Sequence, residues 1–197
     1  MRKILWSVPL AILFLLAPAA ASPATNADPD AAKIVTEDLP RFWEAFDKAA
    51  PEFKAEPFDK LYLSRATPGL HDFVKARIDN AEKLAATVRK APKYYASIRE
   101  STLRIPAAEP QIRAAFHALK KLYPDAVFPD VYFVIGRLTS GGTTSDRGLL
   151  IGAEMYGRTA ETPTDELSEW LQQVLAPVED IPHIVAHELI HFQQKSQ

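Results

Sequence analysis

The sequence contains no cysteine. This absence excludes a thiolate metal site, a cysteine nucleophile and disulfide bonds, so any metal must be held by histidine and carboxylate side chains. It also excludes lipid attachment at a signal-peptide cysteine. Stability must therefore come from packing, and hydrophobic residues, at 47% of the chain, are numerous enough for a sizeable core.

The sequence also lacks an excess of positive charge. It has 23 Lys and Arg against 25 Asp and Glu, a net charge of −2, which becomes −4 once the two basic residues before Ile4 are removed. A nucleic-acid-binding protein would show a basic patch or stripe. No nucleic acid partner is therefore predicted, and so mild an acidic balance implies no acidic substrate.

Long hydrophobic runs are absent except at the N-terminus. Two basic residues precede an apolar run over residues 4–16, and the small residues 19–21 fit a cleavage site. This run is shorter than the roughly 20 residues that a membrane span needs. We predict a signal peptide over residues 1–21, export to the periplasm or the medium, and no membrane span in the mature chain. An uncleaved N-terminal anchor is the alternative.

Glycine is scarce, and six of the seven glycines fall between residues 136 and 157. Segments 131–138 and 149–155 in this region are rich in β-branched and aromatic residues, which predicts two strands. Glycines so close together mark sharp turns or a close approach of the backbone to another group. The segment between the strands is either a wide hairpin or the rim of a binding cleft. It is no phosphate-binding P-loop, because the required lysine is missing.

The rest of the mature chain is predicted to be mostly helical. Residues 22–31 have the composition of a linker, and residues 32–197 have the length of one domain. Trp43 and His117 lie on predicted helices, and both are expected to serve in the core or on the surface rather than as ligands. A fresh helix start is expected near Pro40, within the first of these segments. Helical periodicity covers residues 32–49, 70–90, a stretch after Pro92, 108–122, a helix capped by Thr164 or Thr162, and 181–195.

The motif with chemical content is His187-Glu188-Leu189-Ile190-His191. A helix advances 3.6 residues per turn, so the two histidines stand one above the other and their imidazoles can converge on one ion. Glu188 lies beside the first histidine and can reach a water molecule without being a ligand. Zinc lowers the pKa of such a water towards 7, and Glu188 would move its proton to the leaving amine. A pair of core histidines on an apolar helix is the alternative.

The motif does not supply a third protein ligand. A Gly followed by a third His is excluded, because Gln194 and Gln197 occupy those positions. The other common solution is a Glu on a later helix, beyond residue 197. Among upstream candidates, Glu154 is preferred over Glu179 and Asp180, because a strand before the helix can pass close to the metal.

His183 extends the two histidines to a ladder with a spacing of four residues. Eight residues of helix span about 12 Å, too far for His183 and His191 to share one small ion. We therefore expect His183 to serve at the helix start or to support the ligands.

Several of these segments together resemble a family of bacterial predicted zinc-dependent proteases. The segments are "VYFVIGRLTSGGTTSDRGLLIGAEMYG" and "IPHIVAHELIHFQQ", with "TEDLPRFWEAFDKA", "PGLHDFVKARIDN" and "YYASIRE" upstream. The family is gluzincin-like and has relatives among exported gliding-motility-associated proteins. The resemblance implies a zincin-like fold, a bound Zn²⁺, and a downstream Glu-containing helix that this sequence does not contain.

Two functional hypotheses follow. The first is a zinc-dependent metallopeptidase of the bacterial cell envelope, with His187 and His191 as zinc ligands, Glu188 as the general base, and a peptide or protein as substrate. The second is a non-catalytic envelope protein that retains a zincin-like fold and binds a partner. The expected fold is α+β, with a helical N-terminal layer and a small mixed sheet over the helix of residues 181–195. The domain is expected to be incomplete at its C-terminus, because this helix reaches Gln197 without a glycine cap.

Overall fold

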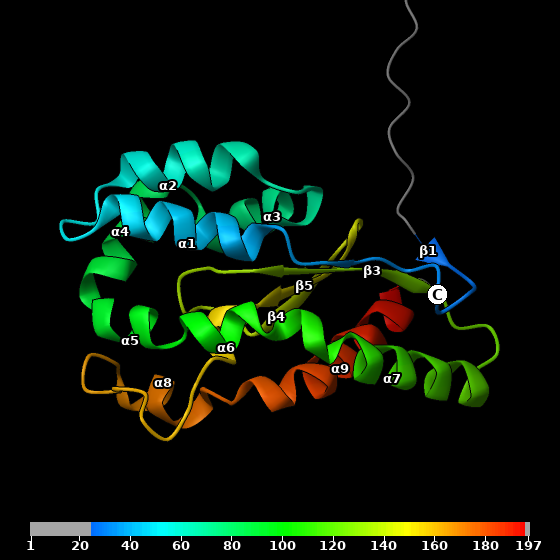
Figure 1. Cartoon of the computed structure of the whole chain (residues 1–197). Helices are drawn as coiled ribbons and strands as arrows, with labels where there is room; N and C mark the ends of the chain where they lie inside the picture. The colour runs from blue at the N-terminus through cyan, green and yellow to red at the C-terminus, as the bar shows by residue number, and fades with distance from the viewer. Residues whose placement is uncertain (1–24, 196–197) are drawn as a thin grey trace, which may run out of the picture.

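The computed structural model describes residues 25–195. The predicted signal peptide over residues 1–21, the first residues of the predicted linker and Gln197 lie outside the described residues. The fold is α+β, as predicted, and consists of a small mixed sheet between two helical layers (Figure 1). The helices are α1 (Asp38–Ala49), α2 (Ala55–Leu61), α3 (Pro68–Phe73), α4 (Ala81–Lys90), α5 (Pro92–Ser97), α6 (Arg99–Leu103), α7 (Glu109–Leu122), α8 (Glu169–Val174) and α9 (Ile181–Lys195).

The sheet is built around two adjacent parallel strands, β3 (Phe128–Val134) and β5 (Gly148–Gly152). Both strands are buried along their whole length, which is typical of parallel strands covered on both faces. The short strands β1 (Thr25–Asn26) and β2 (Ile34–Val35) pair with β3, in antiparallel and parallel directions respectively. Strand β4 (Gly142–Ser145) pairs antiparallel with β5 and forms an edge of the sheet.

The N-terminal helices form the layer above the sheet in Figure 1. Helix α1 buries Leu39, Phe42, Trp43 and Phe46, whose spacing places them on one face. Trp43 belongs to the core: its indole N–H donates to the Thr102 hydroxyl over 3.0 Å. This confirms that the aromatic residues of α1 serve in packing.

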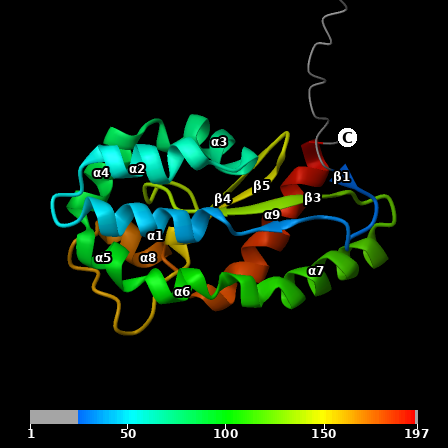
Figure 2. The same ribbon diagram turned by 45° about the horizontal axis from the view of Figure 1, so that its top comes forward.

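Helix α9 covers the opposite face of the sheet. It packs against β3, β4 and β5 and against α7, and Figure 2 shows it running obliquely past the strands. The predicted arrangement, a helical N-terminal layer and a sheet over the last helix, is therefore present. None of the helices within residues 25–195 combines the length and the apolar character that a membrane crossing requires.

Several predicted boundaries are wrong. The segment predicted as one helix over residues 70–90 is two helices, because a π-helical turn (Val74–Ile78) ends at Asp79, whose φ of 77° breaks the helix. The side chain of Asn80 then caps α4 by accepting a hydrogen bond from the Lys83 N–H. Residues 34–35, expected to be helical, form β2, and α1 starts at Asp38, in agreement with the fresh start predicted near Pro40.

The hairpin interpretation of residues 131–155 is also wrong. β3 and β5 are parallel, and the chain between them includes β4, which folds back on β5. The predicted caps of α8 are wrong as well, because Ser168 accepts the hydrogen bond from the Leu171 N–H. Residues 25–31 lie against β3 and α7: Arg113 donates to the carbonyl of Pro29 over 2.8 Å.

Candidate metal and peptide site

Helix α9 has one buried and one exposed face. Val185, Leu189 and Phe192 are buried against the sheet and its neighbours. His187 and His191 lie on the exposed face. The apolar face fixes how the helix is rotated on the sheet, and this rotation directs the two histidines away from the core. They are not the pair of core histidines that was the alternative interpretation of the motif.

The two imidazoles converge. The Nε2 atoms of His187 and His191 are 3.1 Å apart, and the rings lie nearly perpendicular, with centroids 4.7 Å apart. Two nitrogens that bind one tetrahedral zinc at about 2.0–2.1 Å lie roughly 3.3 Å from each other. The Nδ1 atom of His191 is 3.3 Å from the side-chain oxygen of Gln194, a contact that orients its ring. The donor set and its spacing thus fit two ligands of one zinc ion.

Glu188 lies beneath the first residue of β4. Its side chain is buried, with 7% of the residue exposed. A Cβ atom on Gly142 would lie 2.6 Å from the Glu188 Oε1 and 2.7 Å from its Cγ. Only a glycine at position 142 allows the edge strand to approach this carboxylate so closely. The close approach that clustered glycines suggested in the sequence is therefore present here.

We expect Gly142→Ala to lower the free energy of unfolding by about 1–3 kcal/mol, because the added methyl overlaps Glu188 in a packed position. Denaturant unfolding measures this change. The control is Thr139→Ala, in an exposed position of the preceding loop, which should change the stability by about 0.5 kcal/mol or less. Equal stability of both variants would show that Glu188 moves aside without cost.

Cavities flank the exposed face of α9. One, of about 350 Å³, lies between β4 and the second histidine and is lined by Gly142, Thr143, Thr144, Glu188, His191 and Gln194. The other, of about 420 Å³, lies beside the first histidine and is lined by Tyr156, Asp180, His183, Ile184 and His187. The motif thus stands at an open surface between an edge strand and a helix, where a ligand can reach it.

Glu154, the preferred upstream candidate for a third ligand, has another role. Its fully buried carboxylate accepts hydrogen bonds from the backbone N–H groups of Gly136, over 2.8 Å, and Leu138, over 3.2 Å. Burial raises the pKa of this carboxyl to about 7, against the opposing effect of these hydrogen bonds. Within residues 25–195, no three His, Asp or Glu side chains are grouped so that they could hold a metal ion. The candidate therefore does not join the histidine pair.

The other histidines and carboxylates named from the sequence lie outside the pair. His183 is exposed on the first turn of α9, and its Nδ1 is 3.7 Å from a carboxylate oxygen of Asp180. His117 is exposed on α7, with its Nε2 2.9 Å from Asp30. Sequence reasoning missed Tyr156, which borders the cavity beside His187. Its one signal was a tyrosine directly after a predicted strand, among the clustered glycines.

These features define an α+β protein with an H-E-x-x-H helix beneath an edge strand. The chain belongs to the gliding motility protein GldB family, which matches residues 25–197. This confirms the resemblance to gliding-motility-associated proteins, while the zinc-protease part of that resemblance stays a prediction. The family's name marks its members as lipoproteins, and this sequence departs from that pattern because it contains no cysteine. No curated protein and no solved structure matched the chain.

Proposed function

We propose that this chain is an exported protein of the bacterial cell envelope that binds an extended peptide segment of an envelope partner in the cleft between β4 and α9. Membership in a family of gliding motility proteins supports the envelope setting. The observation that carries the binding role is an edge strand beside a cavity, because an extended peptide can add to such a strand through backbone hydrogen bonds. In this binding role, the protein holds its partner without cleaving it.

Zinc-dependent peptide hydrolysis is the second candidate, favoured by the 3.1 Å separation of the His187 and His191 Nε2 atoms. These two side chains would hold the ion from α9. Bound zinc would polarise the peptide carbonyl and acidify a water molecule. Glu188, which lines the cavity between β4 and His191, would take a proton from the attacking water and pass it to the leaving amine.

One experiment distinguishes the binding role from the hydrolytic role: the zinc-treated wild-type protein is incubated with a proteome-derived peptide library. Retention of intact peptides supports the binding role. Cleavage that disappears in Glu188→Gln supports hydrolysis. If the protein neither retains nor cleaves any peptide, both the binding role and the hydrolytic role are contradicted.

A cavity-filling variant tests whether the cleft itself binds the peptides. Gln194→Arg places a longer side chain in the cavity beside β4, and we expect at least about a 10-fold loss of retention. Gln173→Arg makes the same change on the exposed surface of α8 and should retain peptides as the wild type does. Equal retention by both variants would place peptide binding elsewhere on the molecule.

A further inference from the structure

Tyr156 lies where the sheet meets the exposed face of α9. It follows β5 through a 3-10 turn (Ala153–Met155), and it borders the same cavity as His187 and Asp180. A Cβ atom on Gly141 would lie 2.4 Å from the Tyr156 Oη and 3.1 Å from its Cζ. The backbone of the loop before β4 therefore rests directly on the phenol and fixes the position of its hydroxyl.

The hydroxyl of Tyr156 differs from those of three other tyrosines near the end of β3. Tyr62 donates to the carbonyl of Ile135 over 2.8 Å, Tyr95 donates to that of Gly136 over 2.8 Å, and Tyr94 donates to that of Glu154 over 2.5 Å. Among residues 26–194, whose side chains the structure describes, none forms a hydrogen bond with the Tyr156 hydroxyl. Its O–H is thus left to a ligand or to water.

Neutral pH leaves this hydroxyl protonated. Burial raises the pKa of Tyr156 to about 12, and the nearby carboxylates of Glu188, Glu154 and Asp180 act in the same direction. A tyrosine that keeps its proton is a hydrogen-bond donor. Among the residues whose side chains the structure describes, those lining the two cavities beside the histidines include no lysine and no arginine that could donate to a carbonyl oxygen.

We propose that Tyr156 is the hydrogen-bond donor to the carbonyl oxygen of a ligand bound beside His187 and His191. The inference rests on the proposed function, because it takes the histidine pair as the zinc site. It adds a ligand-contacting residue from the segment after β5 to the two metal ligands supplied by α9. A peptide carbonyl held between the two would be fixed from both sides.

The test uses acetohydroxamate, a small zinc-binding compound with a carbonyl oxygen, titrated calorimetrically into the zinc-loaded full chain. Tyr156→Phe removes only the hydroxyl, and we expect at least about a 10-fold weaker affinity for acetohydroxamate, with zinc affinity unchanged. Tyr123→Phe removes a hydroxyl from the residue after α7 and should bind the compound as the wild type does.

The outcomes separate the inference from the proposed site. Unchanged acetohydroxamate affinity in Tyr156→Phe, with zinc bound, would overturn the role of Tyr156 and leave the histidine site intact. A loss of zinc from Tyr156→Phe would also overturn it, since the residue would then act on the metal rather than on the ligand. Failure of the wild type to bind zinc at His187 and His191 would remove the proposed metal site, and the inference with it.

Discussion

His187→Ala should abolish zinc binding, with an affinity loss of more than about 100-fold. Even residues that only support metal ligands contribute 10- to 100-fold to metal affinity, so removal of a ligand must cost more. The pair His187 and His191 is the only convergent pair of imidazoles among residues 25–195, so no neighbouring histidine can replace the missing ligand. Competition against a chromophoric chelator measures the affinity.

Two further variants give this result its meaning. His117→Ala removes an exposed histidine from α7 and should leave zinc affinity unchanged. Glu188→Gln should also retain zinc, because the two imidazoles stay in place, but it should lower any peptide cleavage by at least about 100-fold. Zinc that stays bound in His187→Ala would place the metal elsewhere, and cleavage that persists in Glu188→Gln would exclude Glu188 as the base.

Glu154 should make the protein less stable as the pH rises through neutrality. Burial raises its pKa to about 7 from the ordinary 4.5, so the folded state binds the proton more tightly than the unfolded state does. The stabilisation is therefore full below pH 4.5 and is lost as the pH rises through about 7. The whole effect on the free energy of unfolding is about 3 kcal/mol.

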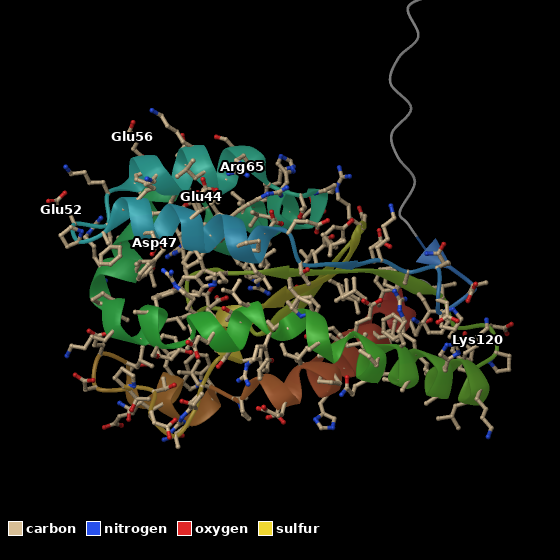
Figure 3. The ribbon with its side chains drawn as sticks, in the orientation of Figure 1. Glu44, Asp47, Glu52, Glu56, Arg65 and Lys120 are labelled. Atoms are coloured by element: carbon tan, nitrogen blue, oxygen red, sulfur yellow. The ribbon has the colours of Figure 1, made fainter. Side chains whose placement is uncertain are left out.

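Denaturant unfolding between about pH 5 and pH 8 tests this effect through the slope of stability against pH. The side chain of Glu154→Gln cannot ionise. Between these two pH values, the variant should therefore lose less of its free energy of unfolding than the wild type does, by most of the roughly 3 kcal/mol. Glu52→Gln is the matched control: Glu52 projects into solvent after α1 and should leave the slope unchanged (Figure 3). Parallel curves for the wild type and Glu154→Gln would mean that the buried carboxyl keeps an ordinary pKa.

Glu154 also shows why a metal ligand predicted from the sequence can have another role in the folded protein. A carboxylate on a predicted strand that precedes the motif helix is a reasonable ligand when only the order of residues along the chain is known. In the folded protein, the backbone turns sharply after β3, and two N–H groups at Gly136 and Leu138 need an acceptor inside the core. An unbonded buried N–H is costly, so the nearby carboxylate is used to satisfy the backbone.

Local physical chemistry determined the motif helix and most of the other helices. The apolar positions of α9 recur at helical spacing, and the same spacing places His187 and His191 one turn apart, so both helix and histidine pair were predictable. The same applies to α7, which runs from Glu109 to Leu122 as periodicity indicated. These features depend on residues within a few positions of each other, and the sequence shows such neighbours directly.

Only the tertiary structure decided how the sheet meets this helix. The pairing of β3 with β5 is parallel, and although the apolar runs in the two segments favour burial on both faces, they do not fix which strands pair or in which direction. That pairing makes β4 an edge strand, brings Gly142 against Glu188, and places Tyr156 beside His187. The contacts of Gly142 with Glu188 and of Tyr156 with His187 join residues more than 30 positions apart. They form because burying two apolar strands between helical layers removes more apolar surface from water than a hairpin exposed on one face would.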